Sequence, residues 1–176
     1  MKALVVYESM FGNTGRIARA IADGLAETAE VTLADVASAP PATGFDLLVA
    51  GAPTHAFGLS RPASREQAKT SGPVRAGATG TGLREYLAGS PPLTGLAAAT
   101  FDTRVDKPIT GSAARKADRR LRRLGCTMLV PPAGFRVAGT TGPLLAGEED
   151  RARRWAASLG QAGLSARTGR PAASGG

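Results

Sequence analysis

The sequence predicts an α/β protein in which helices cover both faces of a parallel sheet, and two observations support this. Short apolar runs rich in valine alternate along the chain with segments whose apolar residues recur every three or four positions. One of these runs, at residues 46–53, is continuously apolar after its first residue, which is typical of a strand buried on both faces. Strands that alternate with helices imply right-handed crossovers between parallel strands. The sequence therefore predicts a doubly wound sheet.

The expected elements follow in order along the chain. The first strand, at 2–8, leads into a helix on which Ile17, Ile21 and Leu25 share one face. The last strand, at 126–137, contains a proline interruption. The remaining expected elements are strands at 30–36, 46–53 and 95–102, and helices at 61–69, 82–88, 112–125 and 148–159.

Length and composition favour one domain in a reducing compartment. We expect the 176 residues to form a domain at 1–164 and a disordered tail at 165–176, which is rich in glycine and small residues. No stretch approaches the roughly 20 apolar residues of a membrane span, and no cleavage site follows the first apolar run. The single cysteine, Cys126, excludes an intramolecular disulfide. We therefore expect a cytoplasmic protein, without a metal site or a catalytic Ser-His-Asp or Cys-His arrangement.

The net charge of +8 raises the question of an anionic partner. Part of this charge lies in RKADRRLRR, at 115–123, where helical spacing predicts a solvated basic face. Only 5% of the residues are aromatic, so stacking on nucleic-acid bases is not supported. Docking to an acidic protein partner or an anionic surface is favoured over nucleic acid, and an idle solvated surface is favoured over either.

Three loops are expected to meet at the carboxyl edge of the sheet, where open sheets of this kind bind ligands: 9–14, 53–60 and 101–106. The first, SMFGNT, opens a helix, and the N–H groups and partial positive charge of a helix start bind phosphate. Serine, asparagine and threonine are also the residues that cap helices, which is the structural alternative. Neither G-x-x-x-x-G-K-[ST] nor G-x-G-x-x-G is present, so a phosphate monoester is favoured over a nucleoside triphosphate or a dinucleotide.

Three motifs together resemble those of a known family. SMFGNT resembles the phosphate loop of flavodoxins, and GAPTHAFG at 51–58 resembles the Gly-x-Pro-Thr stretch before the loop that covers one face of their flavin. GTTGPLLAGEEDRARRWAASL is similar to the connection into the last helix in actinobacterial flavodoxin-like proteins. The resemblance implies a flavodoxin-like fold, in which a five-stranded parallel sheet of order 2-1-3-4-5 forms the middle of three αβα layers. It also implies FMN as the cofactor.

The resemblance carries over to residues in all three loops. The first loop would hold the phosphate. At position 11, where many flavodoxins have a hydroxyl, this chain has Phe11, and quinone-reductase relatives also have an aromatic residue there. The second loop would cover the flavin, and the third would contact its ring. The implied cofactor-binding residues are Ser9, Met10, Phe11, Gly12, Asn13, Thr14, Pro53, Thr54, His55, Ala56, Phe57, Gly58, Phe101, Asp102, Thr103 and Arg104.

Two of these residues leave alternatives open. His55, the single histidine, is either a surface hydrogen-bonding residue or a contact to the flavin edge that gains a proton and stabilises negative charge on the reduced ring. Arg104 either projects into solvent or lies near the ring, where its charge would favour the reduced flavin.

The resemblance implies electron transfer through a noncovalently bound FMN, with a redox partner protein that the basic charge predicts to be acidic. An FMN-dependent NAD(P)H oxidoreductase similar to quinone reductases is the first alternative, although no nicotinamide site is recognisable. A fold relative that has lost its flavin and acts as an interaction module is the second.

Overall fold

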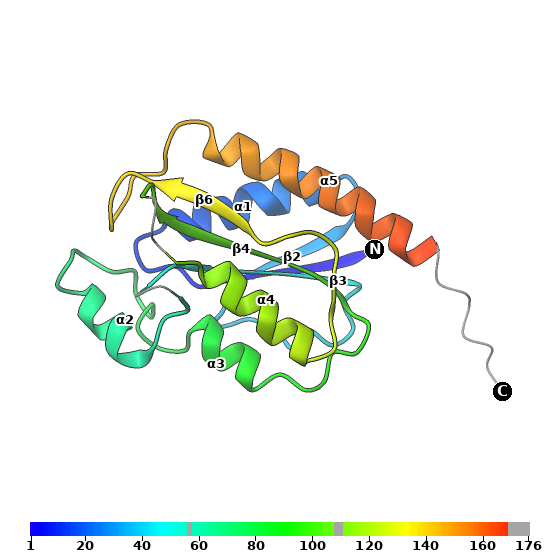
Figure 1. Ribbon diagram of the computed structural model, residues 1–176, viewed down its shortest axis with the longest axis horizontal. Helices are drawn as coiled ribbons and strands as arrows, with labels where there is room; N and C mark the ends of the chain where they lie inside the picture. The colour runs from blue at the N-terminus through cyan, green and yellow to red at the C-terminus, as the bar shows by residue number, and fades with distance from the viewer. Residues whose placement is uncertain (56–57, 108–110, 169–176) are drawn as a thin grey trace.

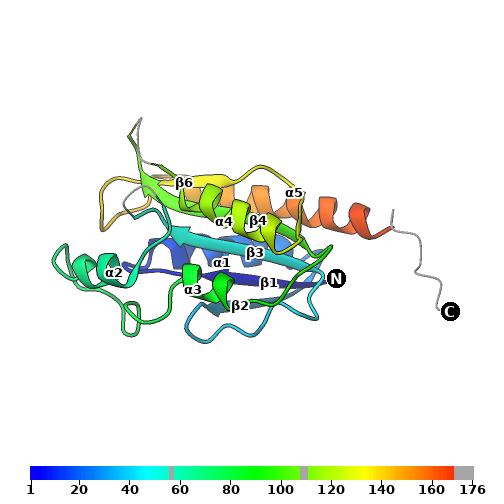
Figure 2. The ribbon, with the colours of Figure 1, turned by 60° about the horizontal axis from the view of Figure 1, so that its bottom comes forward.

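The computed structural model describes residues 1–55, 58–107 and 111–168, in which a parallel sheet is covered by helices on both faces (Figure 1). Helices α1 and α5 pack on one face and α3 and α4 on the other, each pair over its own hydrophobic core (Figure 2). The strands are β1 (Lys2–Tyr7), β2 (Glu30–Asp35), β3 (Leu47–Pro53), β4 (Ala97–Val105), β5 (Thr127–Met128) and β6 (Ala133–Val137). The helices are α1 (Asn13–Leu25), α2 (Pro62–Ala68), α3 (Leu83–Ala88), α4 (Ala113–Arg123) and α5 (Glu148–Thr168).

The strand order confirms the predicted topology. The order is β2-β1-β3-β4-β5, and all of these pairs are parallel. The expected strand at 126–137 is divided into β5 and β6, which both pair with β4. Pro131 and Pro132 lie between the two pieces, and proline has no N–H group to donate to a sheet. The fifth position of the sheet is therefore shared by two short strands.

Strand β4 is longer than the sequence indicated. We expected it to end at 102 and a loop to occupy 101–106, but the strand continues to Val105. The reason is its neighbour, because β6 pairs with residues 101–105 of β4 and extends the ladder. Most of the third expected loop is therefore strand, and its side chains alternate between the two faces of the sheet.

Helix α5 is also longer than expected and includes residues 165–168, which we had placed in the tail. Glycines at 160 and 163 weaken the helical pattern in the sequence, but both lie at close contacts. A Cβ atom at Gly160 would collide with Thr28, and one at Gly163 would lie 3.1 Å from Met1 Sδ. Residues 169–176 lie outside the described part, so a tail there stays a prediction. None of the helices in the described ranges has the length and apolarity needed to cross a membrane.

Gly51 in β3 is required by packing, which gives a first prediction. It lies beside Phe101 of β4, and a Cβ atom at position 51 would collide with the Phe101 ring. That ring is fully buried and packs edge-on against Phe135, with 6.2 Å between ring centroids. We expect Gly51→Ala to lower the free energy of unfolding by about 1 to 3 kcal/mol, as overpacking does. Urea denaturation measures this loss.

Gly89→Ala is the matched control, because a Cβ atom there would lie at ordinary contact distance, 3.5 Å from Glu85 O, and the backbone is right-handed. Equal stability of the two variants would show that the close approach at Gly51 is not a constraint.

Candidate functional site

A cavity of about 350 Å³ lies at the carboxyl edge of the sheet, where the three sequence loops were expected to meet. Nine of the predicted residues line it: Met10, Phe11, Asn13, Thr14, Pro53, Thr54, His55, Thr103 and Arg104. Its volume is within the roughly 300 to 1,000 Å³ range of small-molecule sites. The cavity lies at the topological switch point, since β1 and β3 are adjacent and the chain leaves them in opposite directions.

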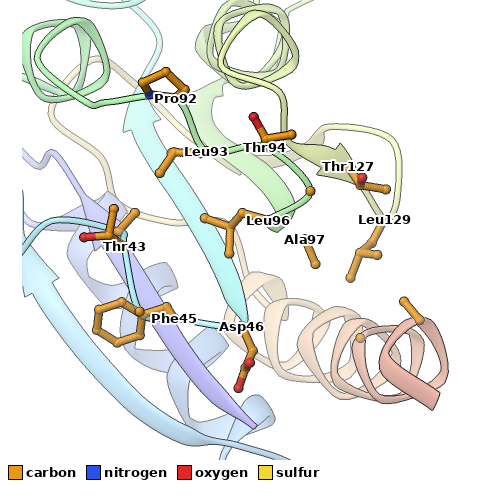
Figure 3. A pocket seen from close by; sticks show the side chains of 15 residues that line it. Thr43, Phe45, Asp46, Pro92, Leu93, Thr94, Leu96, Ala97, Thr127 and Leu129 are labelled. Carbon is orange, nitrogen blue, oxygen red and sulfur yellow. The ribbon is translucent and has the colours of Figure 1, made fainter. Parts of the chain in front are cut away.

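A larger cavity, of about 820 Å³, lies at the opposite edge of the sheet (Figure 3). Phe45, Leu93, Leu96 and Leu129 are among its lining residues, and Asp46 is the one charged residue that lines it in the described part of the chain. Asp46 Oδ2 already accepts a hydrogen bond of 2.7 Å from the Lys2 N–H. This cavity has no cation to attract a phosphate, so the smaller cavity is the better candidate for an anionic ligand.

The start of α1 faces the smaller cavity. Gly12 precedes the helix with φ at 94°, no side chain caps the helix, and no acidic residue lies in its first turn. Ser9 Oγ accepts one hydrogen bond, of 3.2 Å, from the Gly15 N–H. Of the three expected capping residues, only Ser9 therefore bonds to a backbone N–H of the helix. Asn13 and Thr14 lie inside the helix, and their side chains bond to Thr141 and Thr103. Backbone N–H groups at a helix start of this kind are available to an anion.

Two polar side chains of the first turn connect the separate loops. Thr14 Oγ1 and Thr103 Oγ1 lie 2.7 Å apart, both buried, and form a hydrogen bond in which either can donate. Because one hydroxyl donates within the pair, the other keeps its hydrogen for a ligand. Asn13 Nδ2 donates a hydrogen bond of 2.9 Å to Thr141 O in the β6–α5 loop. The helix start is therefore fixed against β4 and against the loop before α5.

Other predicted residues have structural roles. Phe101 is fully buried in the core and Asp102 is fully buried beneath α4, so neither lines the cavity. Asp102 Oδ2 accepts hydrogen bonds from Ser112 Oγ at 2.6 Å and from the Ala114 N–H at 3.1 Å, which holds the start of α4. Gly58 forms two 2.8 Å backbone hydrogen bonds with His55 and does not line this cavity. Ala56 and Phe57 lie outside the described residues.

Arg104 lines the cavity and is held in place by its own strand and the start of α4. Its Nε lies 3.5 Å from Asp102 Oδ1, and its side chain is only 20% exposed. Its Nη1 donates a hydrogen bond of 3.1 Å to Gly111 O. The solvent-exposed alternative is therefore wrong, and the carboxylate of Asp102 offsets part of the charge that Arg104 presents to the cavity.

A largely buried ionic cluster of Glu8, Arg65 and Glu85 lies next to the loops at 9–14 and 53–60. Arg65 of α2 is 2% exposed, its Nη1 lies 3.1 Å from Glu85 Oε2, and the same nitrogen donates a hydrogen bond of 2.9 Å to Ser60 Oγ. Glu8, which precedes the loop at 9–14, is also buried, and its Oε2 accepts a hydrogen bond of 2.8 Å from the Leu83 N–H. Burial raises the pKa of Glu8 despite its hydrogen bonds and the attraction of Arg65.

His55 is expected to be neutral near pH 7. Its burial, and then the nearby charge of Arg65, lower the pKa of His55 below its ordinary value. Its Nε2 is buried and has no hydrogen-bond partner in the part of the chain that the structure describes. A buried polar atom of this kind is a candidate for ligand contact. The neutral form makes His55 a hydrogen-bonding residue at pH 7, and no source of positive charge for a reduced flavin.

The lowered pKa of His55 gives a prediction for the protein without ligand. In the unfolded chain His55 takes up a proton as the pH falls through about 6.5, whereas in the folded protein it stays neutral to lower pH. Acidification therefore favours the unfolded chain, and His55 lowers the free energy of unfolding at acidic pH. We expect His55→Gln to lose less stability than the native protein between about pH 7.5 and pH 5. Urea denaturation at the two pH values measures the difference, and an equal loss in both proteins would contradict the lowered pKa.

Comparison with solved structures identifies the fold. A flavodoxin from an archaeon matches at TM-score 0.65 with 19% identity, over 93% of this chain and 99% of that one. Oxidised flavodoxin 1 from Bacillus cereus matches at TM-score 0.62 with 19% identity, over 94% and 98%. The chain has the flavodoxin fold. A flavodoxin, WrbA-like protein from Agrobacterium tumefaciens also matches, at TM-score 0.60 with 16% identity, over 96% and 99%. No protein-family model and no curated protein sequence matches the chain.

The cavity of this flavodoxin fold includes four residues that the sequence did not indicate. Val105 and Lys107 extend the wall made by β4, and Val137 and Thr140 come from β6 and the loop after it. Lys107 lies in FDTRVDKP and Thr140 in GTTGP, so both belong to stretches that the motifs already marked. Their side chains could not be placed because the end of β4 depends on its pairing with β6.

Proposed function

We propose that the protein binds one FMN noncovalently and transfers electrons through it. The observation that supports this most is the uncapped start of α1, which faces a cavity at the switch point of a flavodoxin fold. The lining contains Arg104 and Lys107, and none of its described residues is a carboxylate, which suits an anionic ligand. The alternative of a helix cap explains the Ser9 bond but not the hydroxyl pair or the cationic lining.

The residues of the cavity fit this cofactor. The N–H groups of the α1 start, together with the Thr14–Thr103 hydroxyl pair, would hold the phosphate. His55 and the second loop would lie against the ring, with the unpartnered Nε2 available for a hydrogen bond. When bound, FMN supplies the redox chemistry, and the protein positions it and sets the electrostatics around it. Arg104 and Lys107 would favour negative charge in the cavity and so favour the reduced cofactor.

A second candidate is an FMN-dependent NAD(P)H oxidoreductase of the quinone-reductase kind. Phe11 favours it, because an aromatic residue lines the cavity where the phosphate loop of a flavodoxin carrier has a hydroxyl. Oxidation of NAD(P)H with a quinone acceptor by the purified protein would support this activity. Its absence, with FMN bound, would favour a carrier that docks with an acidic redox partner in the cytoplasm.

The direct test of the proposal is reconstitution. The purified protein is mixed with FMN, freed of excess by gel filtration, and its visible spectrum recorded. We expect a flavin band near ~450 nm in about one equivalent per chain. A protein that retains no flavin would point to a fold relative that has lost the cofactor.

Thr14→Val tests the contribution of the phosphate site. The change removes the hydroxyl that bonds Thr103 and lies at the cavity, with little change in side-chain shape. We expect FMN binding to weaken by about 1.5 to 3 kcal/mol, which is the range for hydrogen bonds to charged groups. Fluorescence titration measures it, and Thr28→Val, far from the cavity, is the control. Undiminished affinity would mean that the phosphate lies elsewhere.

A further inference from the structure

A third cavity, of about 600 Å³, adjoins the 350 Å³ cavity at the carboxyl edge of the sheet and is lined by cations. His55 lines both cavities, so they are neighbours on either side of this residue. The six basic residues that line it are Arg61, Arg84, Lys116, Arg119, Arg120 and Arg123, and none of the other residues that line it is acidic. We call this the basic cavity.

The cations are brought together by three segments of the fold. Lys116, Arg119, Arg120 and Arg123 recur at helical spacing on one face of α4, which lies beside α3 (Figure 1). Arg84 of α3 donates hydrogen bonds of 2.8 Å to the carbonyl oxygens of residues 59 and 60. Arg120 Nη1 in turn donates to Arg84 O at 3.3 Å, which joins α4 to α3. The cavity wall is thus part of the packed structure.

Ion pairs with the described part of the chain do not neutralise the six cations of the basic cavity. In the described ranges none of them lies within 4.0 Å of a carboxylate, whereas Arg122 on the same helix pairs with Asp118 at 2.8 Å. Burial, and then the charges of Arg120 and Arg61, lower the pKa of Arg84, as expected when like charges crowd together. Glu85, the next residue along, is paired with Arg65. Crowded like charges destabilise a fold, and an anion bound among them would relieve this repulsion.

We propose that the basic cavity binds a diphosphate group, such as a nucleoside diphosphate carries. Arginine guanidinium groups match phosphate oxygens in bidentate geometry, and several converge here on one concave wall. The volume is larger than a single phosphate ion needs and suits a small organic phosphate. Arg84 and Arg120 are half-buried in the wall of this hollow, where a small anion reaches them more readily than a convex acidic protein surface does. The inference concerns a second site and does not depend on bound FMN.

Calorimetric titration of the full chain with pyrophosphate, ADP and orthophosphate tests this proposal at low salt. We expect one site for pyrophosphate and for ADP, with each bound at least about tenfold more tightly than orthophosphate. The double variant Arg119→Gln/Arg123→Gln should weaken pyrophosphate binding by at least about tenfold. Its stability should be unchanged or higher, because both side chains are exposed and repulsion is relieved. Arg122→Gln, which removes a cation paired outside the cavity, should bind like the native chain.

Several results would overturn the proposal. One is that pyrophosphate shows no binding at millimolar concentration, and another is that Arg122→Gln weakens it as much as the double variant. Loss of pyrophosphate binding in Asn13→Asp but not in the double variant would place the anion at the α1 start. A glutamate-rich peptide could also bind the native chain more tightly than pyrophosphate does and lose this binding in the double variant. That result would identify the surface around Arg119 and Arg123 as a protein docking surface.

Discussion

Arg65→Met is expected to lower the free energy of unfolding by about 3 kcal/mol near pH 8. Arg65 is buried, pairs with Glu85 at 3.1 Å and donates to Ser60 Oγ, and its charge also offsets that of buried Glu8. Methionine fills a similar volume but leaves Ser60 without its donor and Glu8 as an uncompensated buried charge. Because Glu8 can escape the penalty by taking up a proton, the loss should shrink toward pH 5. Urea denaturation across this pH range measures both effects.

Arg153→Met is the matched control, since Arg153 is 46% exposed and its 2.7 Å pair with Asp150 lies at the surface. We expect it to change stability by less than about 1 kcal/mol. A loss for Arg65→Met as small as that of the control, or one that does not depend on pH, would contradict the role of the buried cluster.

Asn13→Asp is expected to weaken FMN binding by about 3 kcal/mol, roughly a hundredfold or more, without destabilising α1. The substitution puts a carboxylate into the first turn of a helix that has no acidic residue there. A negative charge at this position stabilises an isolated helix, yet it would repel a phosphate bound at the helix start. The two readings of SMFGNT therefore predict different results, because a capping loop would accept aspartate as readily as asparagine.

Asn13→Ala serves as the control, since it removes the same 2.9 Å hydrogen bond to Thr141 O without adding charge. Flavin fluorescence titration and thermal unfolding are measured for both variants. If Asn13→Asp bound FMN no more weakly than Asn13→Ala, charge at the helix start would be irrelevant and the phosphate would have to lie elsewhere.

The unit made of β1, the phosphate loop and α1 could be predicted because all its signals are local. The valine-rich run, the glycine at position 12 and the helical spacing of Ile17 and Ile21 lie within 20 residues of one another. The alternation of elements predicted a doubly wound parallel sheet, and the resemblance to flavodoxins implied the strand order. The structure added the reason for the glycine at 51, which is the Phe101 ring beside it.

The part of the site that β4 forms, at residues 101–105, could not be predicted from local sequence. The residues FDTRV, at 101–105, contain turn-like and charged residues, and only pairing with β6 makes them a strand. Phe101 and Asp102 are buried deeper in the strand, one on each face, while Thr103 and Arg104, nearer its carboxyl end, line the cavity. The basic cavity was equally hidden, because its cations come from positions 61, 84 and 116–123 and meet only through packing of α3 on α4.

A comparison of FMN with riboflavin tests the central claim most directly, because the two differ only in the phosphate. Each flavin is titrated into the purified chain and binding is followed by quenching of flavin fluorescence. We expect FMN to bind at least about a hundredfold more tightly than riboflavin, because the proposed site at the α1 start would recognise the phosphate. Equal affinity for the two flavins, or no binding of FMN, would contradict it.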